Sequence, residues 1–243
     1  MKQQFENYTA DDLKVWSTLF ERQIVNLADK ASIHFLNALD DMKVVLNPTI
    51  LPNFTSINEW FKSSTGWEIY CVPGLIPVDE FFILLADKKF PSSNWLRSME
   101  KLDYLEEPDM FHDIFGHVPL LSNQVFSDFI QEFGKLGKSM IENKEKLIMM
   151  QRLYWFTIEF GLIREEGMKI YGAGILSSFG EAISSLEEAT ENRFFEIESI
   201  LDQPFITSEM QQFYFFIESF NELFKSIVQL TKKWKSNELA TTK

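Results

Sequence analysis

Apolar residues recur at three- and four-residue spacing along most of this 243-residue chain, which is the pattern of amphipathic helices. The pattern predicts helices over residues 15–28, 31–42, 56–64, 79–89, 107–115, 125–140, 144–162 and 218–234, and two shorter ones around 180–202. Thr9 with Asp12 is typical of a capping box before the first helix, and Ser122 is placed to cap the helix over 125–140. Helices should therefore supply most of the fold.

A few short strands and loops make up the remainder. WEIYCV (67–72) and FYFFI (213–217) have the composition of strands. Residues 47–53 and 91–106 are predicted to be turn and loop, and IYGAGILSSFG (170–180) a glycine-rich loop with close backbone approaches. No repeat or linker interrupts the chain. We predict one mainly α domain over residues 1–236 and a flexible tail over 237–243.

Composition and charge exclude several classes of protein. Hydrophobic residues make up 45% of the chain and charged residues 24%, which is typical of a globular domain. A net charge of −13 argues against binding to nucleic acid or to an anionic membrane surface. Cys71 is the single cysteine, no run reaches 18 apolar residues, and the first residues lack an apolar signal core. The expected location is the cytoplasm.

The stretch LIMMQRLYWFTIEFGLI (147–163) places a carboxylate in an apolar setting. A helix that is apolar on nearly every side is buried, so Glu159 should be buried too. An unpaired carboxylate there would cost several kcal/mol, roughly estimated, so a positive group should meet it. Arg152, seven residues earlier on the same face, or Arg97 would supply an ion pair; a metal ion is the alternative.

HDIFGH (112–117) holds two of the chain's three histidines within another apolar stretch. On a straight α-helix a five-residue step turns by about 140°, so the two rings would not share a face. Gly116 and Pro119 would let the helix finish between them, and His117 would then fold back from the following loop. Two core histidines bonded to carbonyls are the other possibility. His34 has no second histidine close to it in the sequence and is expected to be structural or exposed.

Together His112, His117 and Glu159 make a set of two imidazoles and one carboxylate. Such a set leaves coordination positions open, as non-haem Fe(II) oxygenases require. Zinc hydrolases use the same ligand types, so the set does not select the metal. Asp113 and Asp109 are alternative carboxylate ligands, ranked lower because either could reach solvent or cap a helix.

Long segments of the chain resemble the pterin-dependent aromatic amino acid hydroxylases. EPDMFHDIFGHVPLL (107–121), RLYWFTIEFGL (152–162) and IYGAGILSSFGE (170–181) resemble, in that order, three signature segments of the family. TGWEIYCVPGLIPVDEFF (65–82) resembles its pterin-side loop. The resemblance spans roughly residues 65–225 and is strongest to the bacterial members that act on phenylalanine. It implies the family's catalytic-domain fold, a helical basket with a few short strands.

The resemblance also implies an activity. In the family an Fe(II) ion is held by the residues that match His112, His117 and Glu159, and tetrahydropterin and O₂ react there to hydroxylate an aromatic ring. For this chain it implies phenylalanine 4-monooxygenase activity, which forms L-tyrosine from L-phenylalanine. Tryptophan hydroxylation is the close alternative. Tyrosine hydroxylation is disfavoured, because Phe216 stands approximately where tyrosine-specific members carry aspartate. A zinc hydrolase using the same triad and a non-catalytic acidic binding protein are the alternatives from other classes.

Substrate and cofactor residues carry over in the same way. Arg97 matches the arginine that pairs with the substrate carboxylate, and Trp155 and Phe160 resemble the aromatic wall beside its ring. The implied substrate residues are Arg97, Tyr104, Trp155, Phe160, Gly174 and Ser177. The implied pterin residues are Gly74, Ile76, Phe81 and Asp113.

Two positions depart from the family pattern. Asp113 replaces the usual glutamate after the first histidine, which shortens the carboxylate beside the pterin by one methylene. Leu105 stands where animal members carry threonine. The regulatory domain and tetramerisation helix of the animal enzymes have no counterpart in the chain, so a monomer without allosteric activation is expected.

Overall fold

The computed structural model describes residues 1–103 and 107–241, with side chains up to residue 236. Helices form most of it, as predicted. They are α1 (Ala10–Leu27), α2 (Ile33–Asp41), α3 (Phe54–Lys62), α4 (Val78–Ala86), α5 (Gln124–Ser139), α6 (Lys144–Tyr154), α7 (Ala173–Leu176), α8 (Phe179–Ser184), α9 (Ile197–Asp202) and α10 (Phe220–Thr241). Single 3₁₀ turns lie at Phe5–Asn7, Met99–Lys101 and Pro119–Ser122. Helix α10 runs past residue 236, where we predicted the tail to begin.

The helix starts follow from capping side chains. The capping box of Thr9 and Asp12 is present at the start of α1, as predicted. The cap of α5 is Asn123, whose side chain accepts a hydrogen bond from the backbone N–H of Phe126. The prediction of Ser122 was wrong, because Ser122 ends the preceding 3₁₀ turn and its hydroxyl donates to the carbonyl of Pro119 instead.

Two small sheets accompany the helices. They contain β1 (Glu68–Val72) paired in parallel with β2 (Lys89–Ser93), and a second sheet in the order β4 (Gly167–Ile170), β3 (Gly161–Glu165), β6 (Phe213–Ile217), β5 (Glu191–Phe194). The predicted strands at 67–72 and 213–217 are confirmed. The other four strands, β2 to β5, were not predicted, because each has only four or five residues. Strands β2, β3 and β5 pair with strands distant in sequence, and β4 pairs with the adjacent β3. Pro91 within β2 also argued against a strand there.

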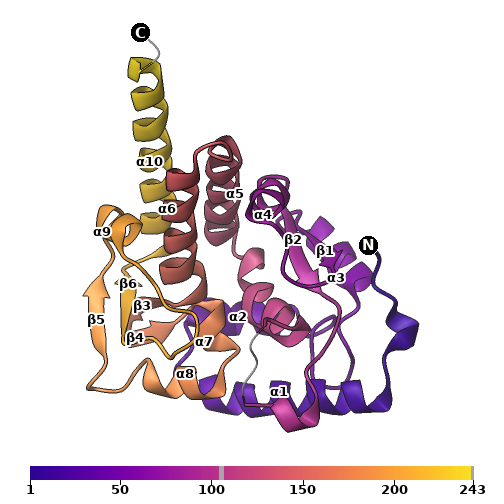
Figure 1. Ribbon diagram of the computed structural model, residues 1–243. Coiled ribbons are helices and arrows are strands. Elements are labelled where there is room, and N and C mark those ends of the chain that lie inside the picture. The colour runs from indigo at the N-terminus through magenta and orange to yellow at the C-terminus, as the bar shows by residue number, and fades with distance from the viewer. Residues whose placement is uncertain (104–106, 242–243) are drawn as a thin grey trace.

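Helices α5, α6 and α10 rise side by side, with the larger sheet on one flank and β1, β2, α3 and α4 on the other (Figure 1). Helix α4 packs closely on α5. Two glycines of α5 permit this: a Cβ on Gly134 would overlap the backbone of Leu85 and Ala86, and one on Gly137 would overlap the ring of Phe82. The mainly α architecture with small sheets agrees with the predicted fold class.

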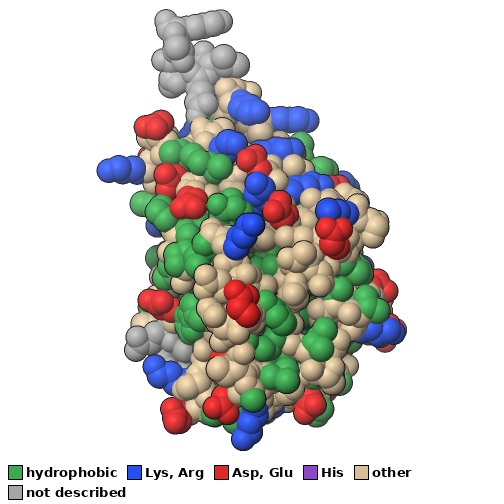
Figure 2. All heavy atoms as spheres, turned by 90° about the vertical axis from the view of Figure 1, so that its right-hand side faces the viewer, with side chains coloured by type: hydrophobic (Ala, Val, Ile, Leu, Met, Phe, Trp, Pro, Cys, Tyr) green, Lys and Arg blue, Asp and Glu red, His purple; other side chains and the backbone are tan. Residues whose placement is uncertain are grey.

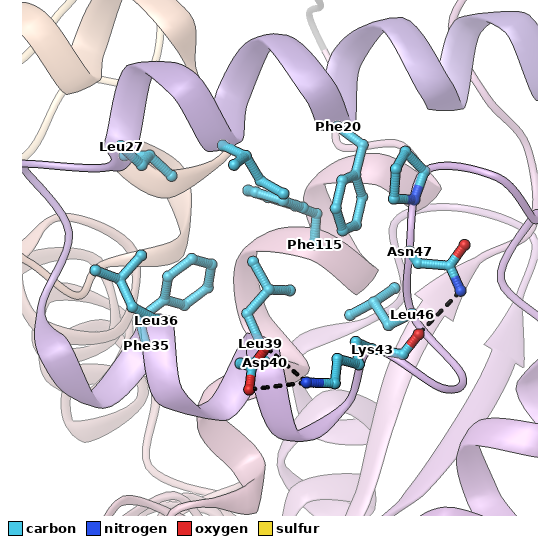
Figure 3. Close-up of a pocket in the computed structure, with 12 residues that line it drawn as sticks. Phe20, Leu27, Phe35, Leu36, Leu39, Asp40, Lys43, Leu46, Asn47 and Phe115 are labelled. Carbon is cyan, nitrogen blue, oxygen red and sulfur yellow. Dashed lines mark hydrogen bonds and ion pairs between the residues drawn. The ribbon is translucent and has the colours of Figure 1, made fainter.

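The core is rich in aromatic rings. Phe115 lies at its centre, stacked on Phe111 at 4.8 Å between ring centroids and edge-on to Phe20 at 5.1 Å. An apolar cavity of about 280 Å³ lies between α1 and α2 and reaches Phe115 (Figure 3). At its rim Asp40 and Lys43 pair with each other. Among the described residues, the one cluster that could hold a metal ion does not line this cavity.

Acidic and basic side chains are interspersed with hydrophobic ones on the face shown in Figure 2. Within the part of the chain that the structure describes, no helix has the length and apolar character needed to cross a membrane.

Glu181 of α8 is a buried carboxylate that joins the helix to strand β6. It is 6% exposed, and its Oε1 accepts hydrogen bonds from the hydroxyl of Tyr214 and the backbone N–H of Gln211. Burial raises the pKa of Glu181, and these two hydrogen bonds offset the rise only in part. The folded protein therefore holds this proton more tightly than the unfolded chain does.

This gives a prediction of pH-dependent stability. Because the folded pKa lies above the unfolded one, the folded state loses relative stability as pH rises through that interval. Glu181→Gln keeps an acceptor oxygen but cannot ionise, so its free energy of unfolding relative to wild type should rise between about pH 4 and about pH 7. Urea denaturation at both pH values measures this. The exposed Glu188→Gln is the control, and an equal difference at the two pH values for Glu181→Gln would contradict the prediction.

Candidate active site

His112 and His117 lie at the two ends of a π-helical turn, His112–His117. We predicted that the helix would finish between the two histidines and that His117 would fold back from the following loop, and this is wrong: the chain stays helical through both residues. Hydrogen bonds of a π-helix span five residues, so residues five apart lie on one side. The two Nε2 atoms are 3.2 Å apart. Gly116 instead lets the turn approach Ala173 of α7 closely.

Glu159 is delivered by a second π-helical turn, Trp155–Glu159, that follows α6 directly. The predicted helix over 144–162 therefore ends early, and the chain continues as β3 from Gly161. Gly161 has to be small, because a Cβ there would overlap the ring of Tyr171 and the carbonyl of Thr157. The wide turn places the carboxylate inside the molecule, where Glu159 is 9% exposed as predicted.

The partners of Glu159 are the two histidines. Its Oε1 is 3.1 Å from Nε2 of His117 and its Oε2 is 3.6 Å from Nε2 of His112. The alternative of an ion pair with arginine is wrong, because Arg152 donates to the carbonyl of Leu201 and Arg97 pairs with Asp109. Burial opposes ionisation of Glu159, but the two imidazoles hold its pKa well below the ordinary value, so it is a carboxylate.

Ser177 determines which nitrogen of His112 faces the carboxylate. Its hydroxyl donates to the carbonyl of Ala173 at 2.8 Å, so its oxygen accepts from Nδ1–H of His112 at 2.9 Å. In the neutral ring Nε2 of His112 is therefore the nitrogen that can offer a lone pair to a metal ion, and it faces His117 and Glu159. Fixing the tautomer of a ligand histidine through its other nitrogen is a common feature of metal sites.

The donor set fits a metal ion. Ligand atoms of His112, His117 and Glu159 all lie within 4.8 Å of one another, and among the described residues this is the one such cluster. Two neutral imidazoles and a carboxylate suit Fe(II), and they suit Zn²⁺ as well. The alternative ligands lie outside the cluster. Asp109 is fully buried against Arg97, and Asp113 accepts from the backbone N–H of Ser93 at 2.8 Å.

A cavity of about 160 Å³ opens directly in front of this cluster. His112, His117 and Glu159 line it. All four residues predicted on the pterin side also line it: Gly74, Ile76, Phe81 and Asp113. Burial raises the pKa of Asp113 above its ordinary value.

The described residues among those predicted on the substrate side do not line this cavity. Phe160 packs against Trp155, with ring centroids 4.6 Å apart, and both are half-buried. A Cβ on Gly174 would stand 2.9 Å from the Phe160 ring and 3.2 Å from Oε2 of Glu159. The missing side chain therefore leaves room between Phe160 and the carboxylate, and the close backbone approaches predicted for residues 170–180 are present.

Arg97 is held in a bidentate pair with Asp109. Its Nε and one Nη contact the two carboxylate oxygens at 2.8 and 2.9 Å, and its other Nη donates to the carbonyl of Leu102 at 3.2 Å. Asp109 also accepts from the backbone N–H of His112, at 3.1 Å. Although burial opposes it, Arg97 keeps the pKa of Asp109 below the ordinary value. One carboxylate thus connects the arginine to the histidine turn.

Two predicted positions, Tyr104 and Leu105, lie outside the described residues. Other residues at the site were not predicted. Tyr154 and Phe90 line the cavity and pack on His117, at 6.2 and 4.8 Å between ring centroids. Nothing in the apolar sequence around Tyr154 and Phe90 distinguishes them as site residues. Asp109 was noticed because it is an acidic residue just before HDIFGH, but it was considered as a possible metal ligand.

Comparison with known proteins agrees with this geometry. The sequence profile described as biopterin-dependent aromatic amino acid hydroxylase matches residues 4–239. The chain is 44% identical over 226 residues to phenylalanine-4-hydroxylase of Chromobacterium violaceum, covering 92% of this chain and 75% of that protein. It is also 44% identical to the Ralstonia nicotianae enzyme of the same name, with 92% and 71% covered.

Solved structures show the same fold. The structure of the Chromobacterium violaceum phenylalanine hydroxylase with bound iron(III) and oxidised cofactor 7,8-dihydrobiopterin matches with a TM-score of 0.90 and 41% identity. The match covers 98% of this chain and 86% of that one. The chain belongs to the family of biopterin-dependent aromatic amino acid hydroxylases.

Proposed function

We propose that the protein is a phenylalanine 4-monooxygenase, which converts L-phenylalanine to L-tyrosine with O₂ and a tetrahydropterin at a non-haem Fe(II). The observation that carries the proposal is the convergence of His112, His117 and Glu159 beside a cavity lined by the four pterin-side residues. The 44% identity to two phenylalanine-4-hydroxylases supports phenylalanine as the substrate.

The three ligand side chains would hold the iron, which supplies the activation of O₂ together with the pterin. Ser177 keeps His112 in the tautomer that a metal needs. The three ligands would leave coordination positions open, and the pterin cavity and the space beside Gly174 both adjoin the cluster. The buried apolar and aromatic side chains around the ligands would limit the access of water to the site.

Arg97 would bind the carboxylate of the amino acid. The hydrogen bonds to Asp109 and Leu102 use three of its five N–H donors, which leaves two for a substrate carboxylate. Asp109 holds the guanidinium in place, so less side-chain freedom is lost on binding. Trp155 and Phe160 would form the wall beside the substrate ring. In the pterin site Phe81 would pack against the cofactor ring and Asp113 would lie near it.

Product identification tests the proposal. The protein is supplied with Fe(II), a reduced pterin, O₂ and phenylalanine, tryptophan or tyrosine in separate reactions. Formation of tyrosine from phenylalanine as the fastest reaction is the expected result. Faster turnover of tryptophan would make the chain a tryptophan hydroxylase, and turnover that needs neither O₂ nor pterin would favour a zinc hydrolase.

The proposal extends to the setting of the enzyme. It acts as a monomer in the cytoplasm, within one catalytic domain over residues 1–236, without nucleic acid or membrane partners. The net charge of −13 and the single cysteine support this setting.

A further inference from the structure

The indole of Trp155 is contacted by three side chains. Its ring centroid is 4.7 Å from that of Phe205, to which it is nearly parallel, and 4.6 Å from that of Phe160. Its Nε1–H donates to Oε1 of Gln211 at 2.9 Å. Phe205 and Gln211 both belong to the segment between α9 and β6, over residues 203–212, so one segment supplies a ring contact and a polar contact to the same indole.

The amide of Gln211 has one orientation. An indole N–H is a donor only, so the oxygen of the amide must face it. The amide nitrogen donates to the carbonyls of Ile206 and Glu209, at 3.1 and 3.3 Å. If the amide were flipped, its NH₂ group would face the indole N–H and its oxygen would face the two carbonyls, and all three hydrogen bonds would be lost. Gln211 therefore presents its oxygen, as a fixed acceptor, to Trp155.

Gln211 is itself anchored to the body of the protein. Its backbone N–H donates to the carboxylate of Glu181 at 3.1 Å, and that carboxylate is buried against Tyr214. Two residues further along the chain, Phe213 begins strand β6, and its ring packs on that of Phe156 at 5.6 Å between centroids. The position of the acceptor oxygen of Gln211 is therefore fixed by the contacts of this segment with α8 and β6.

Trp155 connects Gln211 to the centre of the site. It begins the π-helical turn that ends at Glu159, and its ring contacts Phe160, the residue that follows the carboxylate. Phe160 in turn borders the space left by Gly174. A tilt of the indole would move the Phe160 ring into or away from this space.

We propose that Gln211 is a positioning residue for the aromatic substrate, acting through the indole of Trp155 to set the width of the space beside Gly174. This inference rests on the proposed function, in which Trp155 and Phe160 form the wall beside the substrate ring. Gln211 thereby favours the single ring of phenylalanine over the larger indole of tryptophan. It touches neither the metal ligands nor the pterin cavity, so its influence is confined to the amino acid.

Gln211→Met and Gln212→Met form a matched pair that tests this. Methionine preserves the length of the side chain and removes its hydrogen bonds. Gln212 is the exposed neighbour, and no side-chain hydrogen bond of it is found among the described residues. In Gln211→Met the KM for phenylalanine should rise about threefold to tenfold, the effect of one neutral hydrogen bond. The preference for phenylalanine over tryptophan in kcat/KM should fall, and the KM for pterin should stay unchanged. Gln212→Met should match wild type.

A double-mutant cycle with Trp155→Phe separates positioning from a general effect on the segment. Phenylalanine at position 155 lacks the N–H donor, so adding Gln211→Met should change the KM for phenylalanine less than about twofold further. If Gln211→Met does not fold, Gln211→Asn serves instead, because it is one methylene too short to reach Nε1.

Each outcome decides the matter. An unchanged KM and unchanged preference in Gln211→Met overturn the inference, as does the same fold-change in the Trp155→Phe background, which would mean that Gln211 supports the segment rather than the indole. Failure of the wild-type protein to hydroxylate phenylalanine overturns the proposed function first, and the inference with it, so the two failures are distinguishable.

Discussion

Glu159→Gln is expected to release the iron and to abolish hydroxylation. The carboxylate is the only negative ligand in the cluster, and its oxygens lie 3.1 and 3.6 Å from the two imidazole nitrogens. A neutral amide of the same size fills the same space but loses the charge that holds a divalent cation. Since removal of groups that merely support a ligand costs about 10- to 100-fold in metal affinity, loss of the ligand should cost at least about 100-fold.

Metal analysis after gel filtration, and product formation from phenylalanine, measure the effect. The control is Glu166→Gln, which changes an exposed glutamate between β3 and β4 and should retain iron and activity. Comparison at saturating added iron separates lost affinity from lost chemistry. A Glu159→Gln protein that keeps wild-type iron and turnover would show that the carboxylate is not a ligand.

Asp109→Ala is expected to give the largest loss of stability. The substitution would leave the guanidinium of Arg97 buried without its carboxylate, and would remove the acceptor for the backbone N–H groups of Arg97 and His112. Breaking a buried pair from one side costs about 3–5 kcal/mol of unfolding free energy. Urea denaturation of the metal-free protein measures this without any contribution from iron.

Function should suffer as well, because Arg97 would lose its fixed orientation. If enough folded protein remains at low temperature, the KM for phenylalanine should rise more than the KM for pterin. Glu59→Ala, which breaks the exposed pair with Lys62, is the matched control and should leave the urea midpoint unchanged. A midpoint for Asp109→Ala equal to that of the control would contradict the buried-pair interpretation.

Glu159 shows what the sequence could predict and what it could not. The burial of Glu159 followed from the apolar run around it, and its need for a positive partner followed from the cost of burying a charge. Which partner it takes did not follow, because Arg152, Arg97 and a metal were all compatible with the spacing. The structure brings the two histidines to it, and turns Arg152 toward the carbonyl of Leu201.

For His112 and His117 the sequence indicated the chemistry but not the backbone geometry. Two histidine side chains were sufficient to suggest metal ligands. The local backbone was predicted wrongly, because only a straight α-helix and a helix that ends between the two residues were compared. A π-helical turn satisfies both the spacing of five and a continuous helix. Such turns are rare, and this one packs closely against Ala173 of α7, which the missing side chain of Gly116 permits.

By itself the sequence determined the elements that depend on local pattern: most of the amphipathic helices, the capping box at Thr9 and two strands. It also indicated His112, His117 and Glu159 as a candidate metal-binding set. Tertiary structure alone decided the parallel pairing of short strands, the two π-helical turns, the pairing of Arg97 with Asp109 and the support of Trp155 by Gln211. The physical reason is that helix periodicity and capping act over three or four residues. The other features are stabilised by contacts between residues that the chain brings together only when the whole core has packed.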